Sequence, residues 1–266
     1  MPSITLKTIR DQRRSLALWA VSILGLLATY GAMWPTVRDN TSYADLIKQM
    51  PESMRSLFIA GAAGDLSTPQ GFLYVELLSF MAPMLVLVYT IGAGASAVAG
   101  EEERRTLDLL LSTPVTRTRV VLEKFAAMVV GTAVLGLAFW ASLVIVGVAA
   151  NMSVGAGMAA ATVVHLGMLG LVFGSLALAL GAITGRVGVA RAVPVALAVL
   201  SYLVNALAEM VGWLARVRPV SPFYQYAGHD PIRHGLYWPS LTVAALTCAV
   251  LVALAVAGLR RRDVSG

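Results

Sequence analysis

The sequence is poor in charged residues. Only 13% of its 266 residues are charged, whereas 58% are hydrophobic. A soluble globular domain carries about 25% charged residues, so this composition excludes an ordinary water-soluble fold. The hydrophobic residues are gathered in runs of roughly 20, the length of helix that crosses about 30 Å of hydrocarbon. We therefore predict an all-α integral membrane protein.

Cysteine is nearly missing, and so is any contiguous basic surface. Cys248 is the only cysteine, so the chain cannot form an intrachain disulfide. The formal net charge is +6, but the basic residues lie between the hydrophobic runs and do not form one face. This placement argues against a nucleic-acid partner.

The sequence also lacks the common motifs of catalytic sites. A phosphate-binding loop needs a glycine directly before its lysine, but Lys7, Lys48 and Lys124 follow leucine, isoleucine and glutamate. There is no His-Glu-x-x-His zinc motif and no Gly-x-Ser-x-Gly nucleophile elbow. We expect no catalytic residue, no metal site and no nucleotide-binding domain in this chain.

Six hydrophobic runs are long enough to be transmembrane helices within a single domain over residues 1–266. They cover about 16–34, 72–99, 122–150, 158–184, 192–214 and 238–259. The first run is too long for a signal peptide, so we expect it to be retained. Pro83 and Pro194 should bend the second and fifth spans, because proline removes a backbone donor and clashes with the preceding turn. The Gly170–Gly174 and Gly181–Gly185 spacings predict close helix packing around the fourth span.

The distribution of basic residues predicts the orientation. An even number of spans puts both termini on one side, and cytoplasmic loops carry an excess of lysine and arginine. One side holds fourteen basic residues: Lys7, Arg10, Arg13, Arg14, Arg104, Arg105, Arg117, Arg119, Lys124, Arg186, Arg191, Arg260, Arg261 and Arg262. The other holds six: Arg38, Lys48, Arg55, Arg216, Arg218 and Arg233. Both termini are predicted to be cytoplasmic.

The basic N-terminal segment over 3–15 has Ile4, Leu6 and Ile9 interspersed. This pattern suits a short amphipathic helix at the cytoplasmic surface before the first span. A solvated tail that only sets the orientation is the alternative.

The most informative segment lies between the second and third spans, on the predicted cytoplasmic side. Residues 101–103 are all glutamate and fall in the first turn of a predicted helix over 101–112, where the helix dipole favours acidic side chains. Leu107, Leu110 and Leu111 recur on one face, and Pro114 ends the helix. Such a helix would dock into a partner's groove or rest on the membrane surface.

This segment resembles the characteristic loop of ABC type-2 exporter permeases. The matching residues are Glu101-Glu-Glu-Arg104 and Thr106-Leu107-Asp-Leu-Leu-Leu-Ser-Thr-Pro114-Val115. Arg105 departs from the pattern, because family members often have glycine there. In that family the loop holds the coupling helix that contacts the nucleotide-binding subunit. The resemblance assigns this contact to Glu101, Glu102, Glu103, Arg104, Thr106, Leu107, Leu110, Leu111, Ser112, Pro114 and Arg117.

The resemblance implies the rest of the assembly. It implies six spans with a cytoplasmic N-terminal helix, and short outer helices within 215–237 before the sixth span. ATP and Mg²⁺ would be bound by a separate ABC ATPase subunit, and this chain would bind no cofactor. A second permease, identical or paralogous, would complete the path through the lipid of a bacterial cytoplasmic membrane. Hydrophobic drugs or antibiotics, as in multidrug efflux, are the preferred cargo, while antibiotic peptides, lipids and ions stay open.

Three ionisable residues fall in the outer half of predicted spans: Glu76, Glu209 and His165. Ionisable groups in a membrane are costly, and they often mark a substrate path. These three would line the exit, or would pair locally, for example with Arg216.

Two readings of another class compete with a permease. The chain would be a membrane anchor that recruits a soluble partner through the 101–112 helix, or a membrane-embedded enzyme. ATP-dependent flux separates a permease from both.

Overall fold

The structure, a computed structural model, describes residues 4–38, 49, 51, 54, 68–106, 115–208 and 211–262. Within these ranges the regular structure is helical, with no strand. Five helices are long and apolar enough to cross a membrane, and one bent pair of helices raises the number to as many as six. The prediction of an all-α membrane protein is confirmed at this level.

The first span is one long helix, α1 (Ile4–Arg38). Its 35 residues extend about 52 Å, well beyond the roughly 30 Å of hydrocarbon. The separate N-terminal helix expected over 3–15 is therefore not observed, because those residues form the first turns of α1. No glycine or proline before Gly25 breaks the helix.

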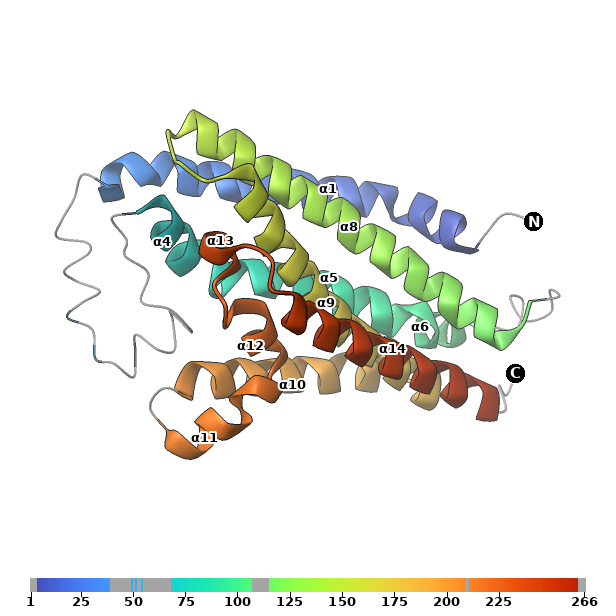
Figure 1. Cartoon of the computed structure of the whole chain (residues 1–266). Coiled ribbons are helices and arrows are strands. Elements are labelled where there is room, and N and C mark those ends of the chain that lie inside the picture. Colours follow the sequence, from blue (N-terminus) through green and yellow to red (C-terminus); the bar gives the residue numbers. More distant parts are fainter. Residues whose placement is uncertain are drawn as a thin grey trace.

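Helix α8 (Arg117–Ala149) runs parallel to α1 (Figure 1). The Thr5 backbone N–H donates to the Glu123 carboxylate at 3.3 Å at one end. At the other end, Gly31 packs directly against Val146. Both helices therefore cross in the same direction, as the predicted topology requires of the first and third spans.

The second span is bent. It consists of α4 (Pro69–Leu73), a π-helical turn η1 (Tyr74–Leu78) and α5 (Met81–Ala97), with an angle of 42° at the break. Pro83 lies in the first turn of α5, where it cannot donate to the Ser79 carbonyl. The bend predicted from Pro83 is confirmed. A short helix, α6 (Ala99–Glu103), follows α5 directly.

Helix α9 (Ala156–Thr184) is the centre of the bundle. It is 67% buried over its most apolar stretch, against 22–33% for the other single-helix spans. It packs against α5, α8, α10 (Val187–Leu207) and α14 (Trp238–Arg261). The predicted close packing is confirmed at Gly170 and Gly174, which lie against α5. Gly185 instead ends α9 in a left-handed conformation, with φ +67°.

Four short elements connect α10 to α14: α11 (Gly212–Val217), η2 (Arg218–Val220), α12 (Pro222–Ala227) and α13 (Pro231–His234). Helices α12 and α13 both begin with proline, whose fixed φ suits the first helical position. Both pack on α9. Helix α10 itself runs unbroken through Pro194, so the bend expected there does not interrupt it.

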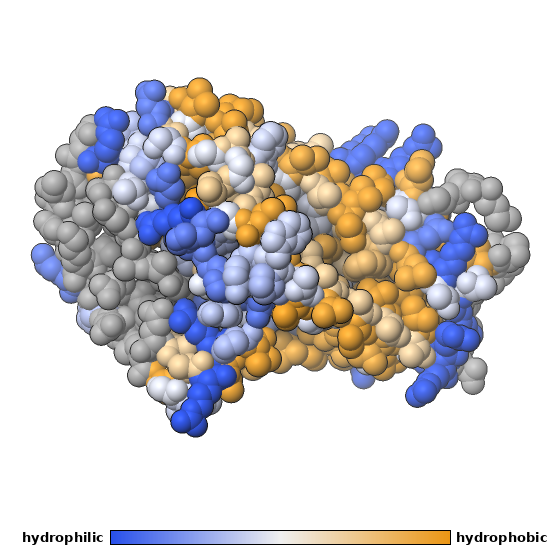
Figure 2. All heavy atoms as spheres, viewed as in Figure 1, coloured by the Kyte–Doolittle hydropathy of each residue, from blue (hydrophilic) through white to orange (hydrophobic). Residues whose placement is uncertain are grey.

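Different elements lie at the two ends of the molecule (Figure 1). Both termini lie at the same end as α6 and the start of α8, while α4, α11, α12 and α13 lie at the opposite end. Figure 2 shows a broad hydrophobic band between two more hydrophilic ends. This is the surface of a multi-pass membrane protein. We call the two ends inner and outer, following the orientation predicted above.

Candidate functional site

Three consecutive glutamates on α6 each contact a different helix. Successive residues on a helix point about 100° apart, so neighbouring carboxylates fan out. Glu101 accepts a hydrogen bond from Lys124 Nζ of α8 at 2.7 Å. Glu102 forms an ion pair with Arg262 at the end of α14. Glu103 accepts from the Val187 backbone N–H, at the start of α10, at 3.0 Å. We call Glu101, Glu102 and Glu103 the carboxylate cluster.

The Glu101–Lys124 pair is the most enclosed of these contacts. The Lys124 side chain is only 8% exposed. Burial raises the pKa of Glu101, but hydrogen bonds from Lys124 and Thr106 and the nearby positive charges outweigh burial, so the pKa lies below its usual value. Glu101 is therefore ionised at neutral pH, and a buried ammonium depends on it.

The other two glutamates hold helix ends. The first backbone N–H groups of a helix have no partner within it, and the dipole there favours a negative charge. Glu103 supplies that partner to α10. At the end of α14, Arg117 donates to the carbonyl oxygens of Leu259, at 2.8 Å, and of Arg262. The starts of α8 and α10 and the end of α14 are thus joined through α6.

Helix α6 ends in a tight reverse turn. The Thr106 N–H donates to the Glu101 carbonyl and the Arg105 N–H to the Glu102 carbonyl, at 2.8 and 2.9 Å, the pattern of a Schellman motif. Arg105 takes the left-handed position, with φ 55°. The helix predicted over 101–112 is therefore wrong in its first half, because the turn stops it at Glu103. Arg105 stands where glycine would be the least strained residue, which fits the glycine of the family pattern.

The structure describes only some of the remaining residues that were predicted to contact the nucleotide-binding subunit. Arg104 is exposed on the turn, and Arg117 begins α8. Thr116 caps α8, since its hydroxyl accepts from the Arg119 N–H at 3.3 Å. The others lie outside the described residues: Leu107, Leu110, Leu111, Ser112 and Pro114.

A large apolar groove lies between α5 and α10. Its volume is about 610 Å³, and its lining includes Met84 and Val88 of α5 and Val195 of α10. Arg191 is the only charged lining residue among those described. At the outer end, Phe223 of α12 lines the groove. The sequence reasoning did not find this groove, because it depends on which helices are neighbours.

Helix α12 is anchored at the bend of the second span. The buried Tyr226 hydroxyl donates to the Leu78 carbonyl at 2.8 Å. Leu78 is the last residue of η1, where the helix breaks. The ring of Tyr202 contacts those of Phe80 and Phe223 edge-on, with centroid distances of 5.7 and 5.4 Å. Helix α12, which carries Phe223 at the outer end of the groove, is therefore anchored to the bend through Tyr226.

The structure does not place Glu76 and His165, the two predicted path residues that it describes, in one site. Glu76 lies on η1, close enough to Tyr30 of α1 to interact with it electrostatically. His165 is buried on α9, in a separate cavity beside α12. Glu209 lies outside the described residues. Neither Glu76 nor His165 lines the groove.

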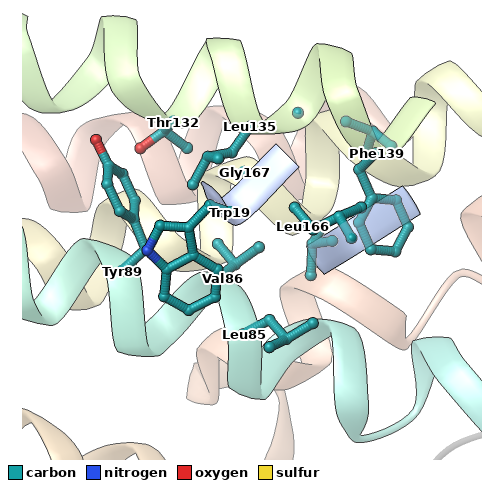
Figure 3. A pocket seen from close by; sticks show the side chains of 12 residues that line it. Trp19, Leu85, Val86, Tyr89, Thr132, Leu135, Phe139, Leu166 and Gly167 are labelled. Carbon is teal, nitrogen blue, oxygen red and sulfur yellow. The ribbon is translucent and has the colours of Figure 1, made fainter. Parts of the chain in front are cut away.

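The middle of the bundle is closed. Figure 3 shows a pocket where Trp19 of α1 and Tyr89 of α5 meet Thr132 of α8 and Gly167 of α9. Its volume is about 20 Å³, enough for little more than one water molecule. A drug-sized molecule therefore has no room in this pocket, whereas the groove between α5 and α10 is much larger.

A family profile described as ABC-2 family transporter protein matches residues 3–264. The match includes α1, the carboxylate cluster and α14. No curated protein matches the chain.

Proposed function

The chain belongs to the ABC-2 family of transporter proteins, and from this premise we propose that it couples ATP hydrolysis by a separate subunit to outward movement of substrate. Membership makes it a membrane permease of an ABC transporter, and it implies an associated ABC ATPase. In our proposal that ATPase binds the ATP and Mg²⁺. This chain lies in a bacterial cytoplasmic membrane with both termini inside.

The carboxylate cluster is the observation that carries the coupling. The ATPase would contact the segment that begins at Arg104, directly after α6. A push on that segment acts on α6, and each glutamate of α6 holds another helix: α8 through Lys124, α14 through Arg262 and α10 through Val187. One displacement would therefore move three spans together with α5.

The groove between α5 and α10 is our proposed path. Its volume of about 610 Å³ lies within the 300–1,000 Å³ typical of ligand pockets. The apolar lining favours hydrophobic drugs or antibiotics. Helix α10 also exposes large apolar side chains, including Val199 and Leu200 at 53% and 56%. A second permease, as a homodimer or heterodimer, would cover this face and complete the path.

The outer ionisable residues stay in the proposal with a narrower role. Glu76 and Glu209 would attract polar parts of the substrate near the exit rather than line the groove itself. His165 faces the separate cavity and would act on the exit only through α12.

Co-purification with the ATPase subunit tests the proposal. We expect the double variant L107D/L110D to lose the complex, because two carboxylates replace the apolar stripe that docks in the ATPase groove. The matched control is L6D, the same substitution on an exposed leucine at the start of α1. Wild type and L6D should retain a stoichiometric complex that hydrolyses ATP. An intact complex in L107D/L110D contradicts the coupling role, and a complex without ATP-driven flux would make the chain an anchor.

A further inference from the structure

A second cavity lies beside α12, away from the groove. It holds about 190 Å³ between α9, α14 and the outer helices. Helix α12 separates the two spaces: Phe223 lines the groove, while Pro222 and Tyr226 line the cavity. The proposed transport path does not use this cavity.

Two buried polar atoms in this cavity lack a partner. His165 and Ser240 are each 2% exposed and line the cavity. Within the described part of the chain, neither His165 Nε2 nor Ser240 Oγ has a hydrogen-bond partner. Leaving such a group unpaired destabilises the folded protein. A bound molecule would remove this cost.

The contacts of His165 define what it offers. Its Nδ1 lies 3.0 Å from the Ala161 carbonyl oxygen. A carbonyl only accepts, so Nδ1 carries the proton in the neutral ring and Nε2 presents a lone pair to the cavity. The other hydroxyls on the wall are engaged, since Tyr226 and Thr247 donate to backbone carbonyls. The Tyr237 backbone also lies close to the ring, and in this tautomer a ligand that donates a hydrogen bond to Nε2 would satisfy that atom.

The remaining wall selects against charge. Among the residues that the structure describes, no charged side chain lines the cavity, and most of the wall is apolar, including Leu169, Val172 and Ala244. Burying an unpaired charge there would be very costly. The volume suits one ring-sized molecule, since an engineered apolar cavity of about 150 Å³ in another protein binds benzene.

We propose that this cavity binds a small neutral molecule with an apolar body and a single hydroxyl or N–H donor. Its donor meets His165 Nε2, and its polar atom reaches Ser240 Oγ. Because Tyr226 lines the cavity and is anchored to the bend at Leu78, the bound molecule would fix α12. Because Phe223 lies on the same helix, the bound molecule would also restrict the position of Phe223 at the outer end of the groove.

Phenol and anisole are the matched probes. Both have one ring, but anisole replaces the hydroxyl donor with a methoxy group and enters lipid more readily. The full chain, labelled with ¹⁵N-histidine and held in lipid nanodiscs, is titrated with each. His165, His229 and His234 are the three histidines in the sequence, and H165Q assigns the relevant signal. We expect phenol to shift that signal with saturation, and anisole to bind at least about tenfold more weakly.

The variants complete the test. S240A should weaken phenol binding several-fold, and H234Q, on an exposed histidine outside the cavity, should leave it unchanged. Equal responses to phenol and anisole, or a response that does not saturate, would mean that the probe only partitions into lipid and would overturn the proposal. Because that comparison uses the wild-type chain, it does not depend on how any variant folds.

Discussion

At the scale of single residues, Asp230 combines a left-handed backbone with a buried carboxylate. Its φ of 47° is left-handed, a conformation that asparagine and aspartate tolerate better than most residues. One carboxylate oxygen has no hydrogen-bond partner among the described residues, and Arg233 lies 3.5 Å from the other. Burial raises the pKa of Asp230, despite the opposing effect of Arg233 and His234. The ionised form is therefore disfavoured in the folded protein.

Replacing Asp230 should separate the cost of charge from the cost of conformation. A raised folded pKa means that Asp230 loses its contribution to stability as the pH rises through that value. We therefore expect D230N to raise the thermal midpoint at pH 7.5 by a few degrees, which corresponds to a gain of about 1 kcal/mol in the free energy of unfolding. The gain should disappear below pH 3.8, the ordinary pKa of aspartate, where the wild-type side chain is protonated in both states. D230L, which cannot tolerate the left-handed backbone, should lower the midpoint. A lower midpoint for D230N would show that the Arg233 ion pair outweighs burial.

For the Glu101–Lys124 pair we expect the opposite dependence of stability on pH. The folded pKa of Glu101 is lowered, so its contribution to stability is present above the ordinary value of 4.5 and is lost as the pH falls through the folded value. E101Q should lower the thermal midpoint at pH 7.5, because it leaves the buried Lys124 without a charged partner. Wild type and E101Q should converge as the pH falls below the folded pKa of Glu101. A constant difference across this range would assign the loss to packing.

Only part of the carboxylate cluster was predictable from the sequence. The sequence singled out Glu101, Glu102 and Glu103 and their charge. It did not identify Arg262 or Val187 as partners, because they are 160 and 84 residues away. Contacts of that separation follow from how the helices pack, and a short motif carries no signal for them.

At the scale of helices, the contact between α5 and α9 depends on two glycines. A Cβ atom built on Gly94 would lie 2.1 Å from the carbonyl oxygen of Gly174, which belongs to the backbone and cannot yield easily. Membrane helices gain stability from such close approach.

Alanine substitution tests this contact. We expect G94A to force α5 and α9 apart and to lower the thermal midpoint by several degrees, or to prevent folding. G92A is the control, because a Cβ there meets nothing within 4 Å and alanine is the better helix former. Thermal unfolding in detergent measures both. Equal midpoints for the two variants would show that the helices reposition without cost.

The sequence predicted the helices better than their ends. Runs of apolar residues and Pro83 were sufficient for the spans and the bend. The change from basic to apolar residues near the N-terminus suggests a boundary between two helices. The structure has the single helix α1 there, because no residue in that stretch breaks the helix. The end of α6 at Glu103 was not predictable either. Glycine usually occupies the left-handed position that ends a helix, but here that residue is Arg105.

At the scale of the whole molecule, α5 connects the two ends. Its outer end begins after the bend, where Tyr226 binds the Leu78 carbonyl, and its inner end leads into the carboxylate cluster. Between them, α5 forms one wall of the groove. This arrangement was beyond the sequence, because lipid-facing and buried faces of membrane helices are equally apolar and periodicity does not reveal which helix surrounds which.

The most direct test of coupling measures the groove itself. Val88 and Val195 line it from α5 and α10 and are 55% and 50% exposed. With the only native cysteine removed as C248A, V88C and V195C take spin labels whose separation can be measured in the complex with the ATPase subunit. We predict that ATP binding changes this separation, that L107D/L110D abolishes the change and that L6D retains it. The same separation with and without ATP, or an undiminished change in L107D/L110D, would contradict the account.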